Sequence, residues 1–197
     1  MRKLLIIIFI LFINFTSASN YPKDSIAIDT NQMNIKEIVE SESGVKIPRY
    51  ANIKYIEYIY NTANDLELPI RIVFRLIYTE SKFKGNTVSH EGAKGFMQLM
   101  PRTYSKYGKL LEINNLNIDN NCKNIIVGLY YLKSMYNYWN KRNITENNKW
   151  KFTLASYNAG INNVIKHKGI PPFKATRNFL AFILKEPSIY LALKNED

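Results

Sequence analysis

The sequence predicts a mainly α-helical domain, and two observations support that prediction. Beyond about residue 50, apolar residues recur at the spacing of amphipathic helices along almost the whole chain. No convincing run of strand-type alternation and no internal repeat interrupts this pattern. Removal of the first eighteen of the 197 residues would leave a chain long enough for one hydrophobic core and too short for two ordinary ones. We therefore expect a single helical domain.

The first residues have the layout of a secretory signal peptide. Arg2 and Lys3 precede a nearly unbroken apolar run at residues 4–15, and small residues follow at 16–19. The apolar run is about a dozen residues long, whereas a membrane-spanning helix needs roughly 20. We expect residues 1–18 to be removed, so that the mature chain is exported to the periplasm or cell wall without a stable membrane span. An uncleaved anchor is the alternative.

The next segment, residues 19–48, is polar and has only isolated apolar positions. This composition is typical of a linker or a loosely docked arm, with at most a short helical turn at residues 35–39. The segment can serve as a plain linker or dock a partner, and the sequence leaves both open. The helical domain is then expected at residues 49–197.

Two helices are predicted at the start of this domain. The apolar face of the first comprises Ile53, Ile56, Ile59, Tyr60 and Ala63. The second begins at Pro69, a residue suited to the first helical position, and its apolar face comprises Ile70, Val73, Phe74 and Ile77. At 100° per residue, Glu80 falls only about 20° from Val73 around the axis. Glu80 should therefore lie at the edge of the buried stripe, in the last turn of its helix.

Glycine and proline separate the later elements. A loop at residues 92–95 leads into a short helix in the run 96–101. Asp119 is expected to cap a long core helix, whose face comprises Ile125, Leu129, Leu132, Met135 or Tyr136, and Trp139. A further helix at residues 150–158 stops at Gly160, and two prolines at 171–172 precede a last helical stretch at 178–184.

The charge of the chain is strongly basic. The formal net charge is +11, and loss of Arg2 and Lys3 with the leader leaves +9. A basic surface favours anionic partners, but export and the absence of a dense basic run with interleaved aromatics argue against nucleic acid. A solvated basic surface without a dedicated partner remains the alternative.

No cofactor or disulfide is expected from the sequence. Cys122 is the only cysteine, which excludes an internal disulfide and favours a small buried side chain in a helix. His90 and His167 are isolated from each other and from any cysteine pair, so no metal site is predicted. The glycines form no phosphate-binding loop.

Glu80 is the candidate for acid and base chemistry. Partial burial and the negative end of its helix both disfavour the ionised carboxylate, so the pKa of Glu80 should be raised toward the range of a general acid. The alternative is an ordinary solvated glutamate, as most helical glutamates are.

Three sequence blocks carry a resemblance to a known family. They are Glu80-Ser81-Lys82-Phe83, the run 89–101 with Gly92-Ala93-Lys94-Gly95-Phe96-Met97-Gln98, and Ala155-Ser156-Tyr157-Asn158-Ala159-Gly160. In this order and spacing they resemble the soluble lytic transglycosylase (SLT) domain family, which is related to goose-type lysozyme. Residues 124–132 and 170–173 fit the same pattern, so the resemblance covers about residues 50–184. It implies a lysozyme-like helical domain with a substrate cleft.

The resemblance also implies an activity for residues 49–197, that of a lytic transglycosylase acting on the glycan strands of peptidoglycan. Glu80 would protonate the β-1,4 glycosidic oxygen between N-acetylmuramic acid and N-acetylglucosamine, and would then accept a proton. The muramic 6-hydroxyl would attack its own anomeric carbon and form a 1,6-anhydro end. A tethered nucleophile explains why one carboxylate suffices.

Further residues match family positions near the sugar. Gln98 and Met100 match positions that line the cleft, and Tyr157 matches a tyrosine beside the catalytic glutamate. Met100 can instead be a core residue and Tyr157 a packed aromatic, while Gln98 needs hydrogen bonds that either sugar or protein can supply. Ser89 and Asn158 are also candidates for substrate contact. Both have a structural alternative, Ser89 as a brace of its loop and Asn158 as a fixer of the turn at Gly160.

Two departures from the family pattern stand out. Phe96 occupies a position where many members have Leu, and Ala175 one where many have a second cleft carboxylate. We infer changes in packing, rate or substrate grip, not inactivity, because the acid and base role belongs to Glu80.

Several roles remain open from the sequence. Small exported members of the family open the wall for secretion or conjugation machinery, and we expect a monomer with such a role. The alternatives are a hydrolytic muramidase, a non-catalytic peptidoglycan-binding or scaffold protein, and a basic nucleic-acid binder.

Overall fold

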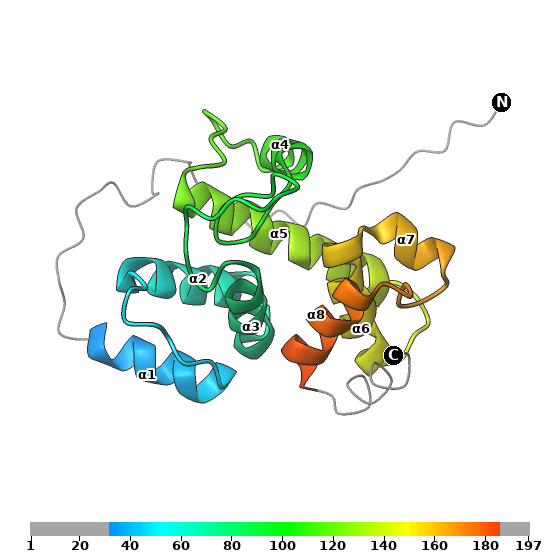
Figure 1. Cartoon of the computed structure of the whole chain (residues 1–197), viewed down its shortest axis with the longest axis horizontal. Helices are drawn as coiled ribbons and strands as arrows, with labels where there is room; N and C mark the ends of the chain where they lie inside the picture. Colours follow the sequence, from blue (N-terminus) through cyan, green and yellow to red (C-terminus); the bar gives the residue numbers. More distant parts are fainter. Residues whose placement is uncertain (1–31, 186–197) are drawn as a thin grey trace. The chain divides into compact units, whose positions relative to one another are not determined.

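A computed structural model describes residues 32–185 of the chain, and helices dominate this range (Figure 1). Their bounds are α1 Gln32–Ser43, α2 Ile53–Asp65, α3 Ile70–Ser81, α4 Pro101–Leu110, α5 Asn121–Asn140, α6 Glu146–Ala159, α7 Ile161–Lys166 and α8 Lys174–Leu184. Two isolated antiparallel bridges, Val88 with Lys94 and Lys94 with Leu99, are the β-type pairings found there. The predicted signal peptide lies outside the described residues. None of the helices between residues 32 and 185 has the length and apolarity needed to cross a membrane.

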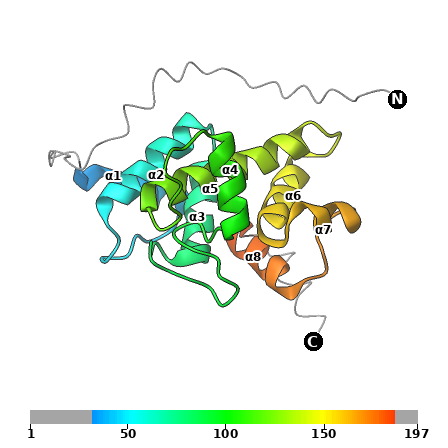
Figure 2. The ribbon, with the colours of Figure 1, turned by 90° about the horizontal axis from the view of Figure 1, so that it is seen from above.

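Helix α5 is the long core helix that the sequence predicts, and it packs against α2, α4 and α6 (Figures 1 and 2). The predicted apolar face is buried, with Met135 rather than Tyr136 as its buried member. The N-cap is Asn120 and not Asp119, because the Asn120 side chain accepts from the backbone N–H of Lys123 at 3.0 Å. Asp119 instead pairs with Lys94 at 3.1 Å.

Helices α2 and α3 follow the predicted pattern closely. Ile56, Ile59 and Ala63 are fully buried on α2, and the predicted face of α3 is buried as well. Pro69 is the N-cap of α3 rather than its first helical residue, and its carbonyl accepts from Ile72 and Val73. The second helix is thus placed correctly to within one residue.

Residues 32–48 differ from the expected linker or loosely docked arm. They form α1 and an extended segment that packs against α2 and α3, with Val39, Val45 and Ile47 buried in the common core. Arg75 of α3 donates from Nε to the carbonyl of Ser43 at 2.8 Å and ties the end of α1 to the domain. The polar composition did not predict this packing, because a short helix needs only a narrow apolar stripe to dock.

The chain between α3 and α4 also departs from prediction. The run 96–99 forms a turn, and the helix begins only at Pro101. Gln98 has φ 44°, a left-handed conformation that does not occur inside a helix. Two further differences are the unpredicted short helix α7, which follows Gly160, and α8, which begins at Lys174 rather than Asn178.

The docking of α1 can be tested by truncating Val39. Val39→Ala should lower the free energy of unfolding by about 2 kcal/mol, because two buried methyl groups are lost and a cavity remains. Chemical denaturation of the mature chain measures this. Glu37→Ala on the exposed face of the same helix is the matched control and should change stability by less than about 0.5 kcal/mol. Equal stability of both variants and wild type would mean that α1 is not part of the core.

Candidate functional site

Glu80 lies in the last turn of α3, partly buried beside the fully buried stripe that includes Val73 and Ile77. Burial raises the pKa of Glu80 to about 8, since the low-dielectric surroundings penalise the charged form. The direction agrees with the expectation from the helical wheel. A carboxyl with this pKa is mostly protonated at neutral pH and can donate a proton.

Tyr157 connects α6 to the turn at residues 96–99. Its side chain is buried, and its hydroxyl donates to the carbonyl of Met97 at 2.7 Å. Burial raises the pKa of Tyr157 well above its ordinary value, and the charge of Glu80 adds to this effect. Glu80 is thus close enough for its charge to act on the Tyr157 phenol, and the raised pKa keeps that phenol protonated as a hydrogen-bond donor.

Tyr157 is the end of a row of three tyrosine rings. Tyr131 of α5 lies between Tyr107, at a centroid distance of 4.8 Å, and Tyr157, at 5.1 Å. Burial raises the pKa of Tyr131 to about 12, and Tyr107 adds to the shift. Sequence reasoning placed Tyr131 only in the connecting helix and missed this position, which depends on contacts between three separate helices.

The loop before α4 is a compact structure with its own hydrogen bonds. Lys94 and Leu99 exchange backbone hydrogen bonds at 3.0 Å, and the N–H of Gly95 donates to Thr87 at 2.9 Å. The side chain of Gln98 donates from Nε2 to the carbonyls of Thr87 and Gly95, at 3.0 and 2.9 Å. From the sequence, either sugar or protein could supply the hydrogen bonds of Gln98. Protein carbonyls supply those of its amide nitrogen.

Asn124 binds the backbone of this loop. Its side chain is fully buried in α5, where Oδ1 accepts from the N–H of Met97 and Nδ2 donates to the carbonyl of Lys94, both at 3.0 Å. A Cβ on Gly95 would lie 2.4 Å from Asn124 Nδ2, and Gly95 has φ +80°, so only glycine fits there. Sequence reasoning assigned Asn124 no role. The available signal was a polar residue beside the apolar stripe of a predicted core helix.

The remaining predicted residues take different positions. Met100 is 44% exposed, unlike the buried Met97 and Leu99, so it is not a core residue. The Ser89 hydroxyl donates to Glu91 at 3.1 Å and accepts from the N–H of Ala93 at 3.2 Å, which braces its loop.

Asn158 does not contribute to the turn at Gly160 in the expected way. Its side chain is exposed, and Oδ1 accepts from Thr176 of α8 at 2.8 Å, so it joins α6 to α8.

Phe96, which stands where many family members have Leu, is buried against Tyr55, with ring centroids 5.2 Å apart. Within residues 32–185, no group of three acidic, histidine or cysteine side chains is placed to hold a metal ion.

Tyr157 thus connects two parts of the candidate site, because its hydroxyl binds the turn at Met97 and its pKa responds to the charge of Glu80. Hydrogen bonds join the 87–100 loop to α5 and α6, and the charge of Glu80 on α3 acts on Tyr157 of α6. A protonated carboxyl such as that of Glu80 can perform general acid and base chemistry.

Comparisons with known proteins bear on the family and the fold of this chain. Residues 57–180 match the sequence model of a family described as the transglycosylase SLT domain. Among solved structures, the chain is similar to an inactive mutant of the lytic transglycosylase Slt from Pseudomonas aeruginosa, with a TM-score of 0.59 and 21% identity. The match covers 82% of this chain and 27% of that one, so this chain spans about a quarter of its length. The predicted mainly α, lysozyme-like fold class is confirmed.

The hydrogen bonds between Asn124 and the loop backbone give a testable prediction. Asn124→Ala should destabilise the domain by about 2–3 kcal/mol, since it leaves the N–H of Met97 and the carbonyl of Lys94 without their partner. The control is Asn137→Ala, an exposed position on the same helix, for which a change below about 0.5 kcal/mol is expected. Urea denaturation compares the two. If Asn124→Ala lost no more stability than Asn137→Ala, the hydrogen bonds of Asn124 would not stabilise the domain.

The raised pKa of Glu80 has a consequence for stability. The unfolded chain releases this proton near pH 4.3, whereas the folded chain keeps it until about pH 8. The contribution of Glu80 to stability is therefore fully present below about pH 4 and is lost as pH rises to 8. Glu80→Gln should gain on wild type across this window, by roughly 4–5 kcal/mol at pH 8.

Thermal and urea unfolding at several pH values measures that gain. Glu42→Gln, an exposed glutamate on α1, is the control and should track wild type within about 0.5 kcal/mol. Parallel curves for Glu80→Gln and wild type would show that the carboxyl carries no burial penalty.

Proposed function

This chain belongs to the transglycosylase SLT domain family, and we propose that it is a peptidoglycan lytic transglycosylase with Glu80 as its acid and base. One observation carries the proposal: the carboxyl of Glu80 is partly buried with its pKa raised to about 8, and its charge acts on Tyr157, whose hydroxyl binds the turn at Met97. Such a carboxyl can give a proton to a leaving group at neutral pH.

The reaction would proceed without water as a reactant. Glu80 donates its proton to the glycosidic oxygen between N-acetylmuramic acid and N-acetylglucosamine, and the bond from that oxygen to the muramic C1 breaks. The muramic 6-hydroxyl oxygen then bonds to C1 and passes its proton to the Glu80 carboxylate, which restores the acid. Burial assists both steps, since it favours the protonated acid before donation and strengthens the carboxylate as a base afterwards.

The sugar would lie along the turn that leads into α4. Met100, 44% exposed, offers an apolar surface for a sugar face. Gln98 uses Nε2 for the loop carbonyls, so its Oε1 can accept from a sugar hydroxyl or N-acetyl N–H. Asn158 engages Thr176 through Oδ1, which leaves its amide hydrogens for a sugar. Ser89 would act through the shape of its loop.

The substrate class sets the proposed location and partners. Peptidoglycan lies outside the cytoplasm, so we infer export to the periplasm or wall, and local wall opening for a secretion or conjugation apparatus. A hydrolytic muramidase is the rival, because Glu80 could equally activate a water molecule.

Replacement of the acid tests the mechanism directly. Glu80→Gln should clear a suspension of purified cell walls at least 100-fold more slowly than wild type, since general acid and base catalysis contributes about 10²–10⁴-fold. The solved Pseudomonas aeruginosa structure is likewise an inactive glutamate-to-glutamine mutant. Glu42→Gln should clear at the wild-type rate. Equal clearing by Glu80→Gln and wild type would exclude the assigned role.

Mass spectrometry of the wild-type digest separates the two reactions. Fragments with 1,6-anhydro ends are expected, each lighter by one water than its hydrolysed counterpart. Reducing muramic ends in their place would establish a hydrolase.

A further inference from the structure

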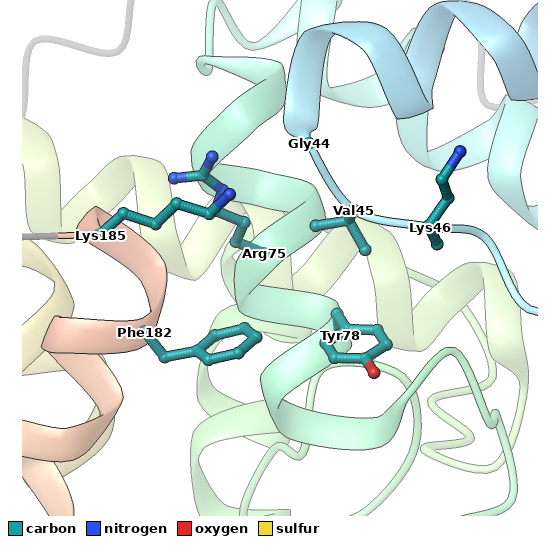
Figure 3. A pocket seen from close by; sticks show the side chains of 7 residues that line it. All are labelled: Gly44, Val45, Lys46, Arg75, Tyr78, Phe182 and Lys185. Carbon is teal, nitrogen blue, oxygen red and sulfur yellow. The ribbon is translucent and has the colours of Figure 1, made fainter.

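A hollow of about 180 Å³, lined by Arg75, Lys185 and Lys46 among others, lies beside α3 (Figure 3). It is formed by the chain just after α1, by α3 and by the end of α8. Tyr78 lines the hollow and precedes Glu80 by two positions in the sequence. Positions two apart on a helix differ by about 200° around its axis. The hollow and the acid therefore use opposite faces of the same helix.

Two cationic groups converge on one point of this hollow. Arg75 is only 6% exposed, and it donates from Nε to Ser43 and from Nη1 to Ile183, at 2.8 and 3.0 Å. A Cβ on Gly44 would lie 3.3 Å from Arg75 Nη2 and 3.4 Å from Lys185 Nζ. The absent side chain of Gly44 thus leaves a gap flanked by both nitrogens, and Figure 3 shows the two side chains converging there.

Among residues 32–185, no acidic side chain lines this hollow to neutralise its positive charge. Lys46, also on its rim, is already paired with Glu40 at 3.0 Å. Burial lowers the pKa of Arg75, which reflects the cost of holding its charge there. An anion in the gap would offset that cost and the repulsion between the two cations.

The wall of the hollow selects among anions. Tyr78 and Phe182 stack with centroids 5.9 Å apart and planes 13° apart, and Val45 lies beside them. Only Arg75 Nη2 and Lys185 Nζ face the gap, so the two oxygens of a carboxylate can each accept one charged hydrogen bond there. A small aliphatic group beside that carboxylate can contact Val45 and the aromatic wall. The chemistry therefore favours a short peptide with a free carboxylate over a bare inorganic anion.

We propose that this hollow binds the carboxylate-bearing stem peptide of peptidoglycan. The proposal rests on the proposed function, since stem peptides are short, bear free carboxylates and small aliphatic residues, and surround any enzyme that works on the wall. The hollow and Glu80 face opposite sides of α3. The peptide bound in the hollow therefore belongs to a neighbouring glycan strand and not to the strand that Glu80 cleaves. Binding would hold the enzyme on the wall between cleavage events.

Titration of the full mature chain with a sugar-free stem tetrapeptide tests this by calorimetry. Lys185→Gln should weaken binding about tenfold, since one charged hydrogen bond is lost. Lys166→Gln, an exposed lysine on α7, makes the same charge change elsewhere and should bind as wild type does. Arg75 is left intact because it supports two backbone carbonyls. Unchanged melting temperatures of both variants verify their folding.

Three outcomes would overturn the proposal: no binding by wild type, equal weakening by Lys185→Gln and Lys166→Gln, or equal binding of inorganic phosphate or an unrelated acidic peptide at the same site. The last result would indicate a general anion site or a protein partner. Glu80→Gln should bind the tetrapeptide like wild type, and Lys185→Gln should cleave peptide-free glycan strands at the wild-type rate. Failure of the catalytic proposal would appear only in the cleavage assays.

Discussion

The incomplete burial of one carboxyl is the constraint on which the rest of this structure depends. The proposed role of Glu80 requires a carboxyl that is shielded enough to retain its proton at neutral pH and open enough to reach a substrate. A position at the edge of the apolar stripe of α3 meets both needs, because the stripe itself is fully buried against the core. The neighbouring helices α1, α2 and α8 pack on α3 and fix this edge in place.

The loop at residues 87–100 is held by a different kind of interaction. Asn124 and Tyr157 are buried polar side chains that each bind the backbone of the turn at Met97, one from α5 and one from α6. A buried polar group without its partner would cost free energy, so this pair selects one conformation of the turn. The left-handed Gln98 and the glycine at 95 make that conformation accessible to the chain.

The sequence predicted the parts that depend on local periodicity. Helices α2, α3 and α5, their buried faces and the edge position of Glu80 all follow from the spacing of apolar residues. The docking of α1 and the turn at 96–99 do not, because they depend on contacts that are distant in sequence, such as those from Arg75 to Ser43 and from Asn124 to Met97. The partners of Gln98 and Asn158 escaped prediction for the same reason. A side chain's type gives its need for hydrogen bonds but not the group that meets it.

The electrostatics of α3 explain how an acid keeps a high pKa in a protein of net charge +11. A lysine near Glu80 would stabilise the carboxylate and lower its pKa, and Lys82 is only two residues away. The Lys82 ammonium instead lies 4.1 Å from the ring centroid of Tyr78 and 5.6 Å from that of Phe182, on the face of α3 turned away from Glu80. Arg75 is committed to backbone carbonyls on that same face. Burial then remains the cause that sets the pKa of Glu80. The aromatic pair of Tyr78 and Phe182 therefore supports the acid indirectly, by holding a cation away from it.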